Sequence, residues 1–244
     1  MPWYYEVAER EHEIQNPTST EKIRQLGEHL RLTPDRQVLD VASGRGGPAL
    51  ILAKAFGCRI TSVERSAAFV EAARGRARRR GLERLVEFHL DDASEFPLEP
   101  EAYDVAMCLG ASFVWGGLEG TLERLVPTAR PGGHVVVGEP YWRQLPLPHG
   151  FEPHRDEVGL VSLEETAAHF RAAGLDLTAI VASSEEDWDR YESLHWRSVE
   201  EWLAQNPDDP DAAEIGRMHR ESRKRYLTWQ RDLMGWAIFA AAKG

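Results

Sequence analysis

The sequence is poor in cysteine, with only Cys58 and Cys108 among its 244 residues. Both lie in apolar stretches far apart in the chain, so their spacing favours neither a disulfide framework nor a zinc site. His149 and His154 are too loosely spaced to indicate another metal site, and no metal is expected. This cysteine usage is typical of a protein in the reducing cytoplasm.

Long apolar runs are also absent. No segment approaches the roughly 18 consecutive apolar residues of a membrane-spanning helix, and the N-terminus lacks the basic region and apolar run of a leader peptide. We therefore expect a cytoplasmic protein that has no membrane partner.

Basic residues are scarce relative to acidic ones, since 29 Lys and Arg stand against 40 Asp and Glu. Nucleic-acid binding depends on clustered Lys and Arg, so the net charge of −11 predicts no nucleic-acid partner. The exception is the arginine-rich stretch 74–80. Because glutamates are interspersed around it, we interpret this stretch as a solvated helix face, with an RNA or phosphate contact as the alternative.

The chain has no internal repeats or low-complexity tracts, and its length suits a single α/β domain over residues 1–244. We divide this domain into an N-terminal arm and helix (1–35), a core (36–182), a helical insertion (183–233) and a last strand (234–244). In the insertion, aromatic and apolar residues recur at helical spacing on either side of a break at 206–210, which predicts two helices. We expect the aromatic stripe to pack against the domain, with a lid or a dimer contact as alternatives.

Strands and helices alternate along the core. The predicted strands are 38–41, 59–64, 86–90, 103–109, 134–139, 175–182 and 236–241. Capping signals start helices near Thr18, Ser66 and Ser162, and a further helix is predicted at 118–128. Such alternation predicts a doubly wound, mostly parallel sheet with helices on both faces.

A glycine-rich turn follows the first predicted strand. Gly44, Gly46 and Gly47 allow close backbone approach, Pro48 suits the first turn of a helix, and Glu64 ends the next strand about 20 residues later. A carboxylate there is placed to accept hydrogen bonds from the two hydroxyls of a ribose. The pattern indicates a nucleoside-containing cofactor, held at a helix N-terminus.

Two cofactor classes fit this turn, because Gly44 to Ala49 also satisfies the pattern of dinucleotide sites. Asp40, at the end of the strand, distinguishes them. A carboxylate there repels a pyrophosphate but suits the ammonium of an amino-acid group, which favours S-adenosylmethionine over NAD.

With Asp40-x-Ala42-x-Gly44-x-Gly46, the chain resembles the class I S-adenosylmethionine-dependent methyltransferases, although Ala42 replaces the first glycine of their motif. The step Asp92-Ala93 after the third strand and the turn 130–133 before the fifth are similar to further family features. The resemblance implies a seven-stranded Rossmann-like sheet whose last strand inserts antiparallel between the fifth and sixth. The resulting candidate cofactor-binding residues are Asp40, Ala42, Ser43, Gly44, Gly46, Glu64, Arg65, Asp92, Ala93 and Leu109.

Three further stretches resemble a bacterial branch of small-molecule methyltransferases, namely 11–17, 138–143 and 206–209. The resemblance places the transferred methyl group near the end of the fourth strand. The loop after that strand offers Ser112 to orient an acceptor and Trp115 to wall its pocket, with packing in the core as the alternative for Trp115.

The fifth strand leads into Glu139, Tyr141 and Trp142, which suit recognition of a polar small molecule. Glu139 is a candidate to accept a proton, and an ion pair with Arg143 is the alternative. His12, in the first of the three stretches, is the other candidate base, and an exposed histidine is its alternative.

The sequence therefore predicts in-line transfer of a methyl group from S-adenosylmethionine to a small-molecule acceptor, by a monomer or homodimer. Positioning in a dry pocket can carry much of the rate, so a base is not required. Two alternatives stay open at this point. One is an NAD-dependent oxidoreductase, and the other is a cofactor-binding scaffold without catalysis.

Overall fold

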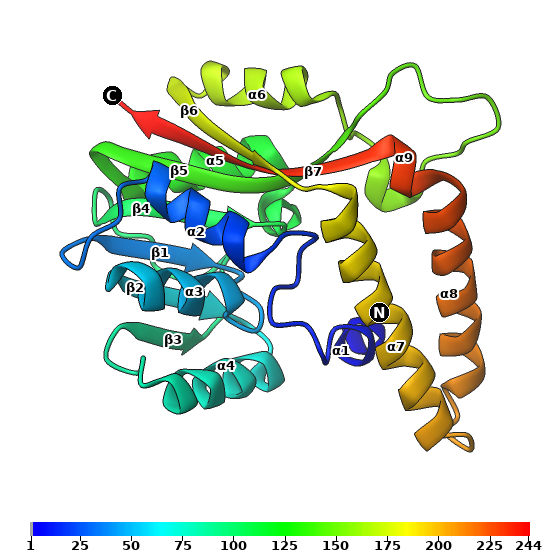
Figure 1. The fold of residues 1–244 in the computed structure, drawn as a ribbon. Helices are drawn as coiled ribbons and strands as arrows, with labels where there is room; N and C mark the ends of the chain where they lie inside the picture. The colour runs from blue at the N-terminus through cyan, green and yellow to red at the C-terminus, as the bar shows by residue number, and fades with distance from the viewer. Residues whose placement is uncertain (1) are drawn as a thin grey trace.

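The computed structural model describes residues 2–244, apart from the side chains of residues 2, 3 and 156. Residue 1 of the predicted N-terminal arm lies outside the described residues. A seven-stranded sheet forms the centre, in the order β3-β2-β1-β4-β5-β7-β6 (Figure 1). Its strands are β1 (Gln37–Val41), β2 (Arg59–Glu64), β3 (Val86–Leu90), β4 (Tyr103–Leu109), β5 (Ala129–Trp142), β6 (Leu175–Ala182) and β7 (Met234–Lys243).

The strands β1 to β5 are parallel to one another, whereas β7 is antiparallel to both β5 and β6. The predicted place of the last strand is thereby confirmed. The pairing of β4 with β5 jumps from Tyr103–Ala129 to Val105–His134. Residues 130–133 are skipped in the ladder, so the predicted turn is present as an irregularity inside a longer strand.

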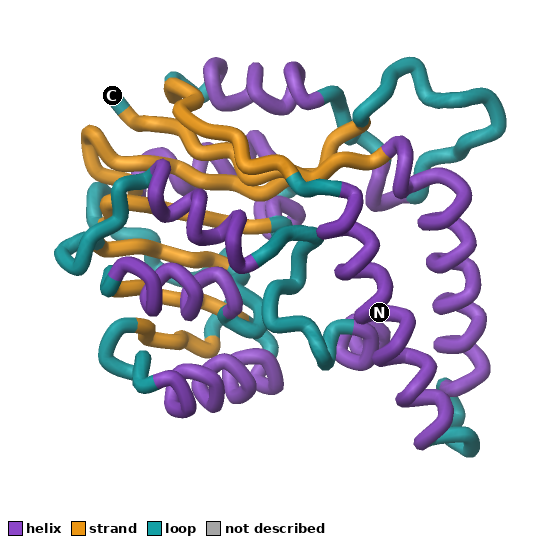
Figure 2. The backbone as a smooth tube through the Cα atoms, in the orientation of Figure 1, coloured by secondary structure: helices purple, strands orange, loops and turns teal. Residues whose placement is uncertain are grey.

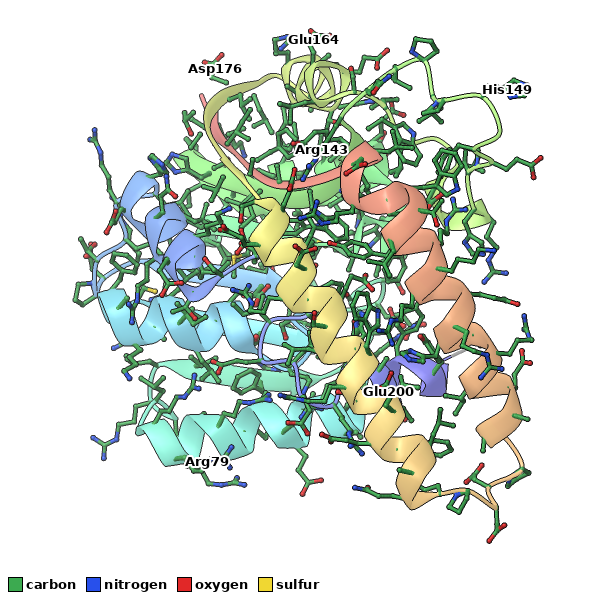
Figure 3. The ribbon with its side chains drawn as sticks, turned by 45° about the vertical axis from the view of Figure 1, so that its right-hand side comes forward. Arg79, Arg143, His149, Glu164, Asp176 and Glu200 are labelled. Atoms are coloured by element: carbon green, nitrogen blue, oxygen red, sulfur yellow. The ribbon has the colours of Figure 1, made fainter. Side chains whose placement is uncertain are left out.

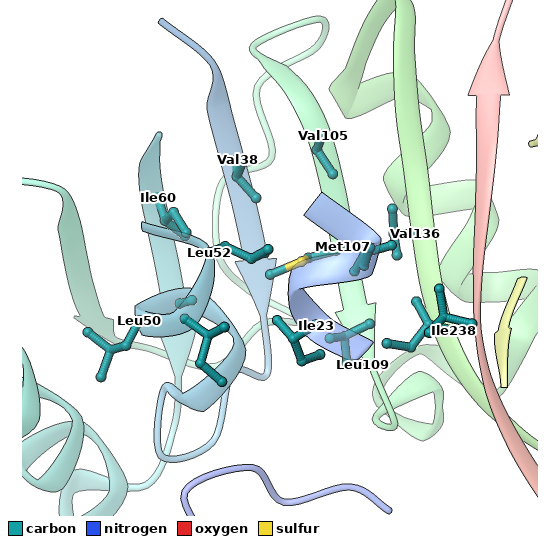
Figure 4. Packing of buried hydrophobic residues seen from close by; sticks show 14 of the residues in the cluster. Ile23, Val38, Leu50, Leu52, Ile60, Val105, Met107, Leu109, Val136 and Ile238 are labelled. Carbon is teal, nitrogen blue, oxygen red and sulfur yellow. The ribbon is translucent and has the colours of Figure 1, made fainter. Parts of the chain in front are cut away.

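Helices cover both faces of the sheet. On one face lie α2 (Thr20–His29), α3 (Gly47–Phe56) and α4 (Ala67–Arg80), and on the other lie α5 (Leu118–Thr128) and α6 (Leu163–Ala172). Figure 4 shows the core on the first face, where Ile23 of α2 and Leu52 of α3 meet Met107 of β4. Burying these apolar side chains fixes the strand ends on which the site is built.

Local capping agrees with the sequence at two helices and differs at one. Ser66 caps α4, and Ser162 with Glu165 forms the capping box of α6, as predicted. At α2 the cap is Ser19, whose side chain accepts a hydrogen bond from the Lys22 amide, so the predicted capping box starting at Thr18 is wrong. A further helix, α1 (Pro2–Ala8), forms within the predicted arm.

The insertion forms two long helices, as predicted, which are α7 (Glu185–Gln205) and α8 (Ala212–Arg225). A π-helical turn (Tyr226–Gln230) and the short α9 (Arg231–Leu233) return the chain to β7. Tyr226 is fully buried and stacks on Trp188 with ring centroids 6.4 Å apart. The aromatic stripe therefore packs α7 against the helices that follow it.

The N-terminal arm and α7 lie side by side at the carboxyl ends of the strands. α1 contacts α7, and the loop from α1 to α2 runs between α7 and the ends of the central strands (Figures 1 and 2). Segments about 180 residues apart thus cover the same edge of the sheet.

The arginine-rich face of α4 is only partly solvated. Arg79 projects from α4 away from the domain (Figure 3), whereas half-buried Arg76 donates to the backbone oxygens of Arg45 and His12. Arg80 donates to both carboxylate oxygens of Glu13 through its two terminal guanidinium nitrogens. The prediction of a wholly solvated face is therefore wrong, because two of these arginines hold the N-terminal arm.

Across residues 2–244, every helix falls short of the length and apolar content that a membrane crossing requires.

Candidate active site

The glycine turn connects β1 to α3 as predicted. Gly44 and Gly46 adopt φ values of 56° and 74°, and Pro48 lies in the first turn of α3. No side chain caps α3, so its N-terminus can receive a ligand. Ala42 also adopts a positive φ of 53°. This residue keeps the backbone shape that a glycine would supply, at a cost of roughly 1–2 kcal/mol.

Glu64 closes the turn from the end of β2. Its two carboxylate oxygens accept hydrogen bonds from the backbone amides of Gly44, at 2.9 Å, and Ser66, at 2.8 Å. A carboxylate has about four acceptor positions, so Glu64 keeps capacity for two hydroxyl donors.

Asp40 lies beneath the turn and is 1% exposed. Burial, and secondarily the charge of Glu64, raises the pKa of this carboxyl group to about 8. Its Oδ2 atom is buried and has no hydrogen-bond partner. A bound cation would compensate this carboxylate, which is the arrangement that the sequence predicted for an amino-acid ammonium.

At the end of β3, Asp92 accepts hydrogen bonds from the amide and hydroxyl of Ser94, and these bonds lower its pKa. Ala93 beside it is buried, while Arg65 after β2 is exposed and acts electrostatically on Asp92. Glu64 and Asp92 end neighbouring parallel strands. The arrangement is that expected for the ribose and adenine of a nucleoside.

Several buried polar atoms on the central strands and the loops that follow them have no hydrogen-bond partner among the described residues. Buried polar groups are normally paired, so unpaired atoms on these segments indicate groups that a ligand can complete. The atoms are Asp40 Oδ2, Ser43 Oγ, Ser62 Oγ, Trp115 Nε1 and Glu139 Oε1. The first two belong to β1 and its turn, and the last two to the segment after β4 and to β5. This donor and acceptor set fits a cofactor with a ribose and a charged amino-acid end.

Glu139 lies near the carboxyl end of β5 and is 7% exposed. Burial raises the pKa of this carboxyl group to about 7, despite a hydrogen bond with Ser112 that opposes the shift. Arg143 Nη1 lies 3.8 Å from Glu185 Oε1, and Glu139 Oε1 has no hydrogen-bond partner among the described residues. The alternative of an internal Glu139–Arg143 ion pair is therefore wrong.

The loop after β4 forms a short 3-10 helix over Ser112–Trp115. Ser112 and Trp115 are half-buried, and Trp115 packs against the core on the second face of the sheet, as its alternative predicted, whereas Phe113 is 69% exposed. The structure thus brings Ser112 together with Glu139, which the sequence placed on two separate segments.

The two aromatic candidates on β5 differ in their surroundings. Tyr141 is half-buried and its ring lies against Gly235. Trp142 is 3% exposed and packs edge-on against Phe151 with ring centroids 5.5 Å apart. Trp142 is therefore part of the hydrophobic core, and the prediction that it contacts substrate is not supported by its position.

His12 is 1% exposed and packs against α7. Its Nε2 atom lies 3.0 Å from the Tyr191 carbonyl oxygen, to which it donates. Burial, reinforced by His195, lowers the pKa of His12 to about 4. An imidazole with this pKa is a weak base, and His12 is not the exposed histidine of the alternative prediction.

Gln15 and Asn16 also reach the strand ends. Gln15 Oε1 accepts from the Arg45 amide at 2.6 Å, and Asn16 donates to the Leu109 carbonyl at 3.1 Å. The sequence singled out the stretch 11–17 but assigned a role to His12 alone. Contact across 93 residues left no local signal for Asn16.

No three described His, Cys, Asp or Glu side chains form a group that could hold a metal ion.

Comparison with known proteins gives a consistent result. Residues 38–133 match a family described as a methyltransferase domain. The uncharacterized protein YjhP of Escherichia coli is 36% identical over 98% of each chain, and its X-ray structure superposes with a TM-score of 0.92 over 100% of both chains, at 35% identity.

A methyltransferase of Geobacter sulfurreducens, solved with S-adenosyl-L-homocysteine, is 34% identical and has a TM-score of 0.91 over 100% of this chain and 99% of its own. The 27-O-demethylrifamycin SV methyltransferase of Amycolatopsis mediterranei is 30% identical over 70% of this chain and 64% of its own length.

The glycine turn allowed two cofactor classes, and these relatives decide between them. The chain belongs to the S-adenosylmethionine-dependent methyltransferases, and S-adenosylmethionine is its cofactor.

Proposed function

We propose that the protein methylates a small polar or amphipathic molecule in the space bordered by Glu139, Ser112 and Trp115. The observation that carries this proposal is Glu139, a buried carboxyl group with an unpaired oxygen and a pKa of about 7. Such a group on the carboxyl edge of a parallel sheet is typical of a functional site.

Different residues bind the different chemical groups of the cofactor. Glu64 receives the ribose hydroxyls, Asp92 and Ala93 border the adenine, and Asp40 compensates the positive charge of the amino-acid end. Ala42, Ser43, Gly44 and Gly46 line the turn, with Arg65 and Leu109 at the flanking strand ends. When bound, S-adenosylmethionine supplies a methyl group on a positively charged sulfur.

Glu139 and its neighbours act on the acceptor. Ser112 orients the attacking atom by hydrogen bonding, while Trp115 and Tyr141 exclude water and keep the approach in line. Glu139 accepts the proton that the acceptor loses, because a carboxylate with a pKa near 7 is matched to this task at neutral pH. His12, with its pKa of about 4, serves instead to pack the arm against α7.

Three observations support a small acceptor rather than a macromolecule. The 27-O-demethylrifamycin SV methyltransferase is named for a small molecule. The net charge of −11 opposes binding of nucleic acid, and the pocket residues are buried or half-buried. Cys58 and Cys108 are buried and form no disulfide, which suits a cytoplasmic protein. We propose that the protein acts as a monomer or homodimer.

The test uses S-adenosylmethionine with a labelled methyl group and a cell extract separated into metabolites, protein and nucleic acid. The protein should transfer label to the metabolite fraction, and Glu139→Gln should lower the rate at least tenfold while S-adenosylhomocysteine binding stays within twofold. Label found only in the protein or nucleic-acid fraction would refute the small acceptor. No transfer to any fraction would favour the non-catalytic scaffold.

A further inference from the structure

The segment from Glu9 to Asn16 packs directly on the glycine turn. A methyl group built on Gly44 would lie 2.1 Å from Gln15 Oε1, and one on Gly110 would lie 2.2 Å from Asn16 Oδ1. On Gly47 it would lie 2.2 Å from the Glu13 carbonyl oxygen. Such distances lie far inside van der Waals contact, so only glycine at these positions leaves room for the segment. We call residues 9–16 the cover, because they pack over the turn.

Two adjacent amide side chains of this cover reach two different strand ends. Gln15 accepts from the Arg45 amide in the turn after β1, and Asn16 donates to the Leu109 carbonyl at the end of β4. The turn and the end of β4 are where the amino-acid end and the reacting end of the cofactor are expected.

An amino-acid group needs hydrogen-bond acceptors for its ammonium and donors for its carboxylate. Around Asn16, the side-chain Oδ1, the second lone pair of the Leu109 carbonyl and the carboxylate of Asp40 are acceptors. Around Gln15, the side-chain amide and the uncapped N-terminus of α3 are donors. The chain thus offers both kinds of group at one place.

The cover is held from its outer side. Arg76 donates to the His12 carbonyl oxygen at 3.3 Å, and Arg80 forms an ion pair with Glu13. Gln15 Nε2 donates to Glu9 at 2.5 Å, and Glu9 in turn accepts from the Tyr191 hydroxyl of α7 at 3.2 Å. Glu9 is 8% exposed, so this line of contacts is shielded from water.

We propose that Gln15 and Asn16 bind the amino-acid end of S-adenosylmethionine, and that Glu9, held by Tyr191, positions Gln15. This inference rests on the proposed function, because it takes the cofactor to lie at these strand ends. It assigns a role to the helical insertion, which places a residue of the cofactor site from α7.

The test compares two ligands by calorimetry. S-Adenosylhomocysteine carries the amino-acid end, and 5′-methylthioadenosine lacks it. Gln15→Ala and Asn16→Ala should each weaken S-adenosylhomocysteine binding by roughly tenfold, which is the usual effect of losing a hydrogen bond to a charged group. Both variants should bind 5′-methylthioadenosine within twofold of the wild type. Gln25→Ala, at an exposed position of α2, is the matched control and should change neither constant.

Tyr191→Phe tests the positioning role. It should weaken S-adenosylhomocysteine binding by roughly threefold and leave 5′-methylthioadenosine unaffected. Because Tyr191 acts through Gln15, combining it with Gln15→Ala should add nothing to the effect of Gln15→Ala alone. Additive effects of the two substitutions would overturn this part.

The other outcomes are equally decisive. Equal losses for both ligands would show a merely structural cover, and tighter S-adenosylhomocysteine binding in Gln15→Ala would show that Gln15 competes with the cofactor. Either result overturns the inference. Unchanged binding in both alanine variants also overturns the inference, but it does not contradict the proposed function. A wild-type protein that binds neither ligand would contradict the whole proposed cofactor site.

Discussion

Asp40 and Glu139 are kept in the site at a cost to stability. Burial raises the pKa of both carboxyl groups, to about 8 and about 7. In the unfolded chain both groups ionise near pH 4. Between these values the folded state binds more protons than the unfolded state, so stability falls as pH rises. A bound cation would offset this cost at Asp40.

Glu139→Gln should therefore stabilise the cofactor-free protein at pH 8, by on the order of 2–3 kcal/mol. The amide cannot ionise, so the gain should shrink as pH falls and be absent at pH 4. Urea unfolding of both proteins at pH 4, 6 and 8 measures it. Equal stability at pH 8 would mean that Glu139 is not held in a destabilising environment.

Glu64→Ala should weaken S-adenosylhomocysteine binding at least tenfold, because Glu64 accepts the ribose hydroxyls in the proposed site and its hydrogen bonds close the turn. Calorimetry measures the loss, with exposed Glu83→Ala as the control. An unchanged dissociation constant would show that the ribose lies elsewhere.

At the residue scale, the sequence revealed what is local. Asp40, the turn and Glu64 lie within 25 positions, and the backbone pattern that relates them repeats across proteins with this turn. The pairing state of Glu139 could not be predicted, since it depends on Arg143 pairing with Glu185 across 42 positions. The same reason explains His12 and Trp142, whose partners come from α7 and from the loop after β5.

Among the elements, all seven strands were predicted, and β1, β2, β3, β4 and β6 agree with the predicted bounds to within one residue. β5 and β7 are longer than predicted, because their pairing with each other continues beyond the apolar runs. The helix α1 in the arm was not predicted. α1 has little amphipathic pattern over its 7 residues and is completed by contact with α7. That contact includes a buried ionic cluster in which His195 lies 3.7 Å from Glu9 and 4.0 Å from Glu192.

His195 should stabilise the junction of the arm and α7. Burial lowers the pKa of His195, but the two nearby glutamates raise this pKa by more than burial lowers it. The resulting pKa is about 9. This stabilisation is fully present below the ordinary histidine pKa of about 6.5 and is lost as pH rises through 9. His195→Gln should therefore cost about 2–4 kcal/mol at pH 6 and almost nothing at pH 10.

Urea unfolding at these two pH values tests the role of His195. The control is His149→Gln, since His149 lies exposed on the loop after β5, at the outer edge of the molecule (Figure 3). A loss that does not depend on pH would show that the imidazole only fills space.

Over the whole molecule, the N-terminal arm and the helical insertion meet at the carboxyl ends of the parallel strands, whereas the C-terminus lies at the opposite end of the sheet (Figure 1). The arm and α7 meet across the glycine turn, and β7 returns from the insertion into the sheet beside β5. The insertion is therefore tied to the site at both of its ends, through Tyr191 near its start and through the pairing of β7 with β5 beyond its end. Sequence periodicity predicted its two helices but not where they lie.

The most direct measurement is a crystal structure with S-adenosylhomocysteine. We expect the ribose at Glu64, the amino-acid end between Asp40 and the arm, and the sulfur facing a space lined by Ser112, Trp115 and Glu139. A sulfur that faces away from Glu139, or a ribose that lies away from Glu64, would contradict the proposed site.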